Sequence, residues 1–281
     1  MSADVAQIVP PHERRILEAF VRRVPLSRLA LENRPLNEYE TEELKSLLKL
    51  RMKGLPLQYL TGSQAFYGRE FYVNTNVLIP RPETEGLVEA ALKELPAPQD
   101  GVTLLGLDFG TGSGCIALTI ALERRDVLVT AAECMNEARL VAEENARKLR
   151  CPKVRFLEVS ETPQLWQYDD LGLLDFVISN PPYLVESDEI ATDVRTHEPP
   201  EALFVPENDP LYYYHFLAEL MNAKLKTSGF GIFEIAEQRG AETAAVFEEK
   251  GFTATIMKDL TERDRYLLVR RSVTLGVASH G

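Results

Sequence analysis

The segment Asn-Pro-Pro-Tyr at 180–183 carries the residue types with the clearest chemistry in this chain. It directly follows the apolar stretch 176–179, which is typical of a buried strand. Consecutive prolines fix the backbone and supply no N–H donors, so the side-chain oxygen of Asn180 and the carbonyl oxygen of Pro181 can act as neighbouring acceptors. Tyr183 offers an aromatic face. The pattern favours a planar amine or carboxamide as ligand, although Asn-Pro also begins ordinary turns.

A glycine-rich loop lies where a predicted strand, 103–109, turns into a predicted helix. Its residues are Gly110, Thr111, Gly112, Ser113 and Gly114. Glycine at alternate positions permits a tight turn and lets backbone N–H groups approach a ligand, although a mere turn has similar composition. The loop lacks the Gly-Lys-Ser/Thr ending of a phosphate-binding loop, so an NTPase is disfavoured. Asp108, just before the loop, either holds its backbone or faces a cationic ligand.

Glu133 stands at the end of the next predicted strand, 127–132, and 25 residues after Asp108. In a doubly wound sheet, an acidic side chain at this place can accept hydrogen bonds from both hydroxyl groups of a ribose. Taken alone, Glu133 is equally well explained as a solvated residue at the end of a loop. Together with the glycine-rich loop, it favours binding of a nucleoside.

These three features together predict transfer of a methyl group from S-adenosyl-L-methionine to an –NH₂ nitrogen. The carbon bound to the sulfonium is already a strong electrophile, so neither a nucleophilic side chain nor a general base is required. The rate then comes from alignment and from carbonyl dipoles. An amide nitrogen is a weak nucleophile because its lone pair is delocalised. Two acceptors on its hydrogens would favour the pyramidal, more reactive form.

Strand-like and helix-like stretches alternate along the chain after residue 101. Seven strands are expected, at residues 103–109, 127–132, 154–159, 176–179, 230–235, 252–257 and 266–269. Helices between them are expected at about 115–123, 136–149, 211–225 and 239–250. The alternation predicts an α/β fold with a doubly wound, mostly parallel Rossmann-like sheet, in which only the last two strands form an antiparallel hairpin.

The first part of the chain has a different character. Apolar side chains recur at helical spacing within 11–60, where Asn37 followed by Glu40 indicates the start of a helix. Aromatic and β-branched residues at 66–79 indicate a hairpin or short strands. Thr84 is of a type that caps helices and precedes another apolar helical pattern. A small helical unit and a β connector are therefore expected before the sheet.

Composition limits the class of protein further. The 281 residues exceed one average domain, and their net charge of −12 disfavours nucleic acid as the main partner. No apolar run approaches the roughly 20 residues that cross a bilayer, and the first ten residues lack the basic start of a secretion signal, so a cytoplasmic protein is expected. Because Cys115, Cys134 and Cys151 show no CxxC spacing, neither a disulfide nor a metal site is predicted.

The sequence resembles the release factor glutamine methyltransferases, the PrmC/HemK family, over roughly residues 12–270. The similarity includes Gly-Leu-Pro-Leu-Gln-Tyr-Leu-Thr-Gly at 54–62 and Leu-Ile-Pro-Arg-Pro-Glu-Thr-Glu at 78–85. Its specific part is Pro-Arg-Pro-Glu-Thr-Glu at 80–85 together with a helical N-terminal unit. The resemblance implies methylation, with S-adenosyl-L-methionine as cofactor, of the glutamine side-chain amide in the Gly-Gly-Gln loop of class I peptide chain release factors. A monomer is expected.

The resemblance also implies a domain division and residue roles. A helical release-factor-binding domain is expected at 1–75, with a β-hairpin connector at about 63–80, and a methyltransferase domain at 81–281. The glycine-rich loop would contact the cofactor, and Glu133, where the family usually has Asp, would bind its ribose. The glutamine would be held by Asn180, Pro181, Pro182 and Tyr183. Asn180, Pro181 and Tyr183 would be the catalytic residues, and Asn180 would also lie near the cofactor.

Several alternatives stay open at this point. The glycine-rich loop and the Asn-Pro-Pro-Tyr segment also occur in adenine-amino methyltransferases, so a nucleic-acid base is the alternative substrate, and a catalytically silent binder is a third interpretation. The connection 184–210 has eight acidic residues and only Arg195 as a base, which favours a substrate-covering loop and disfavours nucleic acid. Arg81 and Glu85 either support the site or form a structural ion pair. Trp166 belongs either to a lid or to the core.

Overall fold

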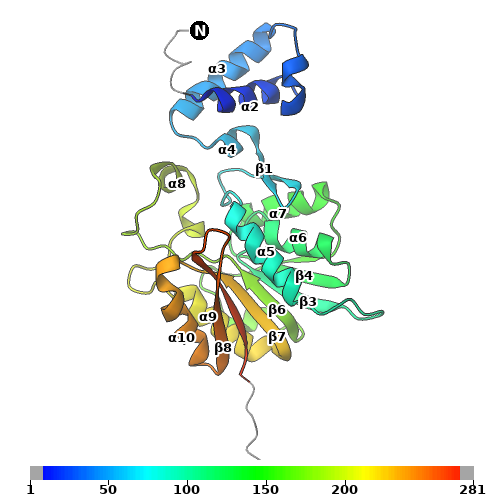
Figure 1. The fold of residues 1–281 in the computed structure, drawn as a ribbon, viewed down its shortest axis with the longest axis vertical. Coiled ribbons are helices and arrows are strands. Elements are labelled where there is room, and N and C mark those ends of the chain that lie inside the picture. Colours follow the sequence, from blue (N-terminus) through cyan, green and yellow to red (C-terminus); the bar gives the residue numbers. More distant parts are fainter. Residues whose placement is uncertain (1–8, 273–281) are drawn as a thin grey trace, which may run out of the picture.

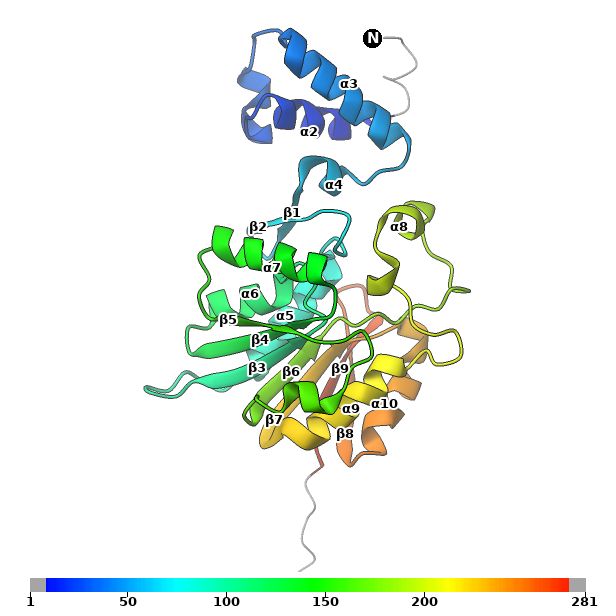
Figure 2. The same cartoon turned by 180° about the vertical axis from the view of Figure 1, so that it is seen from behind.

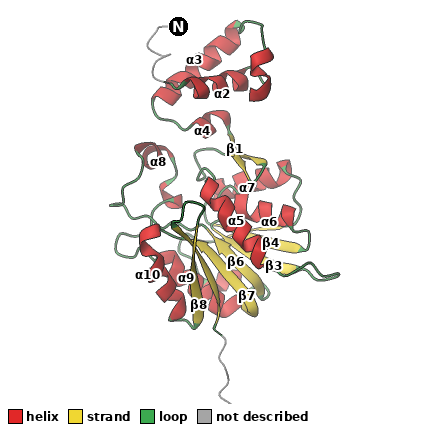
Figure 3. Cartoon of the chain, viewed as in Figure 1, coloured by secondary structure: helices red, strands yellow, loops and turns green. Residues whose placement is uncertain are grey.

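The computed structural model describes residues 9–272, so the outermost residues of both expected domains lie outside the described part. A seven-stranded sheet forms its centre (Figure 3). In chain order its strands are β3 (Leu104–Phe109), β4 (Val127–Glu133), β5 (Val154–Glu158), β6 (Leu174–Ser179), β7 (Leu225–Glu234), β8 (Phe252–Lys258) and β9 (Asp264–Arg271). Their spatial order is β5-β4-β3-β6-β7-β9-β8. The first five strands in that order are parallel, and β9 is antiparallel to both neighbours, as the predicted fold class requires.

Helices cover both faces of this sheet (Figures 1 and 2). One face carries α5 (Pro82–Glu94), α6 (Cys115–Glu123) and α7 (Asn136–Lys148), and the other carries α9 (Tyr212–Lys224) and α10 (Gly240–Glu248). Because neither face of the central strands meets water, these strands are mostly apolar. Leu107, Val129 and Val177 are accordingly fully buried.

β7 begins earlier than the sequence predicts. Residues 226–229 are polar or glycine, so hydropathy gives no strand signal before residue 230. In the structure, Leu225 pairs with Leu174 of β6, and the Lys226 ammonium lies 2.8 Å from both carboxylate oxygens of Asp175. The neighbouring strand therefore holds this polar stretch in extended conformation. The predicted antiparallel hairpin of β8 and β9 is confirmed.

The N-terminal helices pack around a small core of their own. α2 (Pro11–Val21) and α3 (Glu38–Met52) contact each other above the short helix α4 (Leu57–Thr61), as Figure 1 shows. Leu17 and Leu48 are buried between them. This core is separate from the two clusters that cover the sheet.

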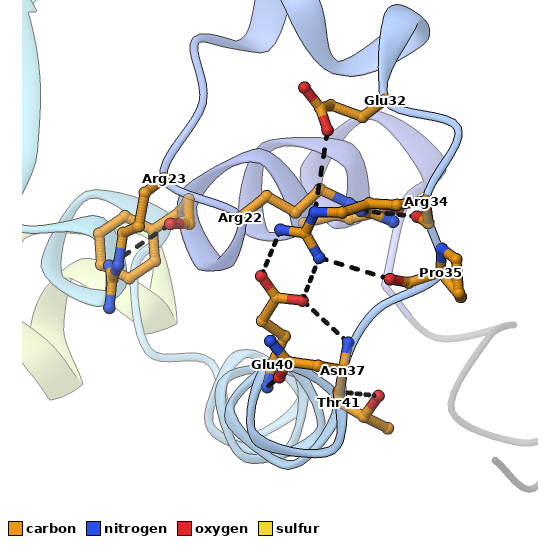
Figure 4. Close-up of polar contacts among 10 residues, drawn as sticks. Arg22, Arg23, Glu32, Arg34, Pro35, Asn37, Glu40 and Thr41 are labelled. Atoms are coloured by element: carbon orange, nitrogen blue, oxygen red, sulfur yellow. Dashed lines mark hydrogen bonds and ion pairs between the residues drawn. The ribbon is translucent and has the colours of Figure 1, made fainter.

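α3 begins at the capping box that the sequence predicts (Figure 4). The side-chain oxygen of Asn37 accepts from the backbone N–H of Glu40 at 2.8 Å, and the Glu40 carboxylate accepts from the N–H of Asn37 at 2.9 Å. Arg34 donates to both Glu40 oxygens. The arginine and the backbone hydrogen bond together lower the pKa of Glu40 to about 2. The helix start is therefore fixed by charge as well as by capping.

A two-stranded hairpin connects these helices to the sheet. β1 (Ser63–Phe66) and β2 (Arg69–Tyr72) are joined by Tyr67 and Gly68, whose φ angles of 49° and 72° suit a tight hairpin turn. Phe66 is buried in the core over the sheet and anchors the hairpin. The strands end at Tyr72, so the hairpin is shorter than the stretch 66–79 in which strands were predicted.

Asn145 of α7 ties this connector to the glycine-rich loop. Its side-chain nitrogen donates to the carbonyl oxygens of Tyr72 and Ser113, each at 2.9 Å, and its oxygen accepts from the N–H of Tyr72 at 2.7 Å. The side chain is fully buried. One residue thereby fixes the hairpin, α7 and the loop relative to one another.

α5 begins at Pro82, so the prediction that Thr84 caps this helix is wrong. The residue before the helix is Arg81, and a proline in the first turn has no N–H that needs a partner. The hydroxyl of Thr84 instead donates to Glu234, at the far end of β7.

The connection 184–210 is more ordered than the sequence indicates. It contains α8 (Thr192–His197), which Figure 2 shows beside the N-terminal helices. The ring Nε2 of His197 lies 3.3 Å from the carbonyl oxygen of Lys53, just after α3, and the Arg51 guanidinium lies 3.8 Å from Asp193. Within residues 9–272, no helix has both the length and the apolar character that crossing a membrane requires.

Candidate active site

A cavity of about 960 Å³, including its open mouth, lies at the carboxyl ends of β3, β4, β5 and β6. The strand order reverses between β3 and β6, and open parallel sheets bind ligands at such a point. The walls come from the segments after these strands, from the segment before α5 and its first turn, and from the 184–210 connection: residues 76–78, 80, 81, 84, 109–113, 115, 116, 132–135, 138, 159–161, 180, 182, 199, 201 and 202 contribute, as does Tyr213. The cavity therefore contains the glycine-rich loop, Glu133 and Asn180.

The glycine-rich loop leaves room for a ligand on its cavity side. Gly110, Gly112 and Gly114 have φ angles of 70°, 54° and 80°, which side-chain-bearing residues rarely adopt. A Cβ built on Gly110 or Gly112 would meet no atom within 4 Å, whereas one on Gly114 would lie 3.0 Å from Leu118. The first two glycines therefore line open space, and the third permits close helix packing. The cradle fits the cofactor that the sequence predicts.

Asp108 lies beneath the loop and holds it. Its Oδ2 accepts from the hydroxyl of Thr111 at 2.6 Å and from the N–H of Ala117 at 3.2 Å. Its Oδ1 is buried without a hydrogen-bond partner among the residues that the structure describes. Burial raises the pKa of Asp108 to about 7. Of the two roles that the sequence left open, the structure supports the one in which Asp108 holds the backbone.

Glu133 lines the cavity but is buried, with 6% of its surface exposed, so its interpretation as a solvated residue is wrong. One carboxylate oxygen accepts from the N–H of Gly112 at 2.8 Å, and the other from the N–H groups of Cys134 and Met135 at 2.9 and 3.1 Å. The thiol of Cys134 also faces that second oxygen at 3.6 Å, so of about four acceptor positions the open one for the ribose is on the oxygen hydrogen-bonded to Gly112. The side chain fixes the glycine-rich loop to the end of β4.

The Asn-Pro-Pro-Tyr segment leaves the end of β6 at the boundary between two cavities. Asn180 and Pro182 line the large cavity, and the whole segment lines a second, adjoining cavity of about 480 Å³. The hydroxyl of Ser179 donates to the carbonyl oxygen of Phe109 at 2.6 Å, which fixes the segment beside the glycine-rich loop. The predicted residues of the two motifs are therefore neighbours in space.

Two polar residues behind the segment were missed by the sequence analysis. Thr84 and Glu234 are 2% and 3% exposed, and the hydroxyl of Thr84 donates to the Glu234 carboxylate at 2.8 Å. Thr84 accepts from the side-chain amide of Asn180, and the other Glu234 oxygen accepts from the hydroxyl of Tyr183, both at 3.3 Å. Glu234 is the last residue of β7 just as Glu133 is the last residue of β4, so an acidic residue at the end of an apolar strand was the available signal.

Arg81 and Glu85 do not pair with each other. Arg81 donates to Glu198 of the 184–210 connection at 2.5 Å and lines both cavities, whereas Glu85 accepts from the N–H of Tyr67. Glu198, whose side chain is 1% exposed, also accepts from the N–H of Ile79. The connection thus closes one side of the site. Trp166, in contrast, is 68% exposed, so its placement in the core is wrong.

Comparisons with known proteins agree with this architecture. The family described as "Methyltransferase small domain" matches residues 89–197. A solved methyltransferase from Pyrococcus furiosus superposes with a TM-score of 0.54 at 15% identity, covering 74% of this chain and 92% of that chain. The likeness at that identity concerns the fold. Fold and family match therefore agree with the methyltransferase class that the sequence predicts.

Sequence relatives narrow the class. A release factor glutamine methyltransferase of Flavobacterium psychrophilum is 39% identical over 263 residues, which are 90% of this chain and 89% of that protein. The Bacillus subtilis protein of the same name is 37% identical and covers 84% of this chain and 83% of its own length. This chain belongs to the release factor glutamine methyltransferase family, as the resemblance in its motifs indicates.

Proposed function

We propose that this chain transfers the methyl group of S-adenosyl-L-methionine to the side-chain amide nitrogen of the glutamine in the Gly-Gly-Gln loop of class I peptide chain release factors. The observation that supports this proposal best is the position of Asn180. It lines both the cavity of the glycine-rich loop and the adjoining cavity of Pro181 and Tyr183. A carboxamide bound to Asn180 would therefore lie next to the methyl group of a cofactor in the first cavity.

The cavity beside the glycine-rich loop, which we call the cofactor cavity, supplies binding groups for a charged nucleoside derivative. The backbone of residues 110–114 and the carboxylate of Glu133 would hold the cofactor, the latter through the ribose hydroxyls. When bound, the cofactor supplies an electrophilic methyl group on a sulfonium. Because that group is already activated, the chain needs no nucleophilic side chain, and its residues contribute by orienting the acceptor.

The adjoining cavity lined by residues 180–183, which we call the acceptor cavity, suits a carboxamide. The side-chain oxygen of Asn180 and the carbonyl oxygen of Pro181 would each accept one hydrogen of the glutamine –NH₂ group, while Pro182 and Tyr183 would flank its plane. Positive charge develops on the nitrogen as the N–C bond forms, and two acceptors stabilise it more than they stabilise the planar amide. As this bond forms, the C–S bond of the cofactor would break with its electron pair left on sulfur, and the nitrogen would then release one proton to water, which leaves the N-methyl amide.

The rest of the chain would bind the substrate protein. We assign release-factor binding to a helical domain at 1–75, with the hairpin near 63–80 as connector and 81–281 as the methyltransferase domain. The separate core of α2, α3 and α4 supports this division. The chain would act as a monomer in the cytoplasm, where its substrate takes part in translation termination.

Methylation of a purified release factor with radiolabelled cofactor tests this function. Wild-type protein is expected to label one glutamine, identified by mass spectrometry of the tryptic peptide, and Asn180→Ala is expected to lose about tenfold to a hundredfold in rate. Asn222→Ala, at an exposed position near the end of α9, is the matched control and should retain the wild-type rate. Label in DNA or RNA instead of the release factor would refute the substrate.

A further inference from the structure

A series of hydrogen bonds, buried at Thr84 and Glu234, lies along one wall of the acceptor cavity. It runs from the side-chain amide of Asn180 to the hydroxyl of Thr84, on to the carboxylate of Glu234, and ends at the hydroxyl of Tyr183. Its members come from α5, from β7 and from the segment after β6, up to 150 positions apart in sequence. Burial raises the pKa of Glu234 to about 6, so its carboxylate is charged at pH 8.

The direction of each hydrogen bond in this chain follows from the chemistry of its members. A carboxylate has no proton to donate, so the hydroxyl of Thr84 must donate to Glu234. A hydroxyl has a single proton, and Thr84 can therefore only accept from Asn180. The group of Asn180 that faces Thr84 must then be its –NH₂ group. Its oxygen, at the other end of the planar amide group, is left as an acceptor for a ligand.

The two ends of an asparagine amide have the same shape, and only their partners decide which end faces a ligand. With its oxygen presented, Asn180 joins the carbonyl oxygen of Pro181 as a second acceptor. Two acceptors bind an –NH₂ group and repel a carboxylate. With the amide turned by 180°, one donor and one acceptor would face the substrate, and one amide hydrogen of glutamine would lose its partner.

We propose that Thr84 and Glu234 are positioning residues that fix the amide of Asn180 with its oxygen toward the acceptor cavity, and that they thereby make the site selective for –NH₂ groups. This inference rests on the proposed role of Asn180. A carboxylate buried without need costs folding free energy. Glu234 is connected to Asn180 through the hydroxyl of Thr84, so the role in orienting Asn180 accounts for its burial.

Thr84→Val and Thr84→Ser test the proposal as a matched pair. Valine keeps the shape of threonine and removes the hydroxyl, whereas serine keeps the hydroxyl. At pH 8 and saturating cofactor, Thr84→Val is expected to lower kcat for a purified release factor about tenfold, and Thr84→Ser to stay within about threefold of wild type. Cofactor affinity measured by calorimetry should stay within about twofold in both, which also shows that the variants fold.

A double-mutant cycle separates positioning from general damage. If Thr84 acts through Asn180, adding Thr84→Val to Asn180→Ala should change kcat by no more than about twofold. Glu234→Gln gives Thr84 an N–H neighbour as well as an oxygen, so it should lower kcat less than Thr84→Val and lose its effect once Asn180→Ala is present. Equal losses in both backgrounds, or wild-type kcat for Thr84→Val, would overturn the proposal. Full activity of Asn180→Ala would instead refute the proposed function of the site, and with it the positioning role.

Discussion

Asp108 makes the stability of this protein depend on pH in a direction opposite to that of most carboxylates. The side chain is fully buried, and only one of its oxygens has hydrogen-bond partners among the described residues. Burial raises its pKa from 3.8 to about 7, because the charged form loses its hydration. Replacing it by asparagine removes the titration and keeps the shape, so Asp108→Asn isolates its contribution.

The sign and size of the effect follow from proton linkage. The folded state binds the proton of Asp108 more tightly than the unfolded state, so the stabilisation is complete below pH 3.8 and is lost as the pH rises through about 7. Over that window the free energy of unfolding falls by about 1.4 kcal/mol per pH unit from this group. Between pH 5 and pH 8 the loss amounts to about 3 kcal/mol.

Urea unfolding followed by far-ultraviolet circular dichroism at pH 5, 6, 7 and 8 measures this loss. The stability of wild type relative to Asp108→Asn should decline by about 3 kcal/mol across the series. Asp170→Asn, at an exposed position, serves as control and should run parallel to wild type. Parallel curves for wild type and Asp108→Asn would show that Asp108 is already ionised at pH 5, and the reasoning from its burial would then be wrong.

Further substitutions test the loop, the sheet and the connection. Gly112→Ala should cost about 1–2 kcal/mol of stability because of its φ angle of 54° and should weaken cofactor binding in calorimetry, since the new Cβ enters the cavity. Gly106→Ala should destabilise the sheet by about 1–3 kcal/mol in urea unfolding, because its Cβ would lie 2.0 Å from the Phe176 ring. Glu198→Gln should weaken the contact to Arg81 and increase cleavage within 184–210 in limited proteolysis; unchanged cleavage would count against a closing role for this contact.

Patterns local in sequence predicted most of the sheet. The buried strands around β3 and β6 are continuous apolar runs, and their carboxyl ends must lie at one edge, so the loop at 110–114 and Asn180 could be placed together. The early start of β7 could not be predicted, because residues 226–229 have no strand-forming character of their own. Their conformation depends on the neighbouring strand.

Contacts distant in sequence were beyond such patterns. Thr84 looks like a helix cap in sequence, but Pro82 starts the helix, and the hydroxyl of Thr84 is used by Glu234 instead. The contact of α8 with the end of α3 depends on single polar groups, such as His197 and the carbonyl oxygen of Lys53. No periodicity encodes contacts of this kind, because each depends on where two elements meet in space.

Different parts of the site would contact different parts of the substrate, which explains why the motifs alone do not identify the substrate. In the proposed function, residues 180–183 with Thr84 and Glu234 would select an –NH₂ group, which glutamine and adenine share. The other walls of the acceptor cavity come from outside the sheet: Leu78 and Arg81 precede α5, and residues 194–203 belong to the connection. These walls can change shape without moving the ends of β6 and β7. If the site works as proposed, these walls would discriminate between an amide and a base, while the residues that orient the nitrogen could stay the same.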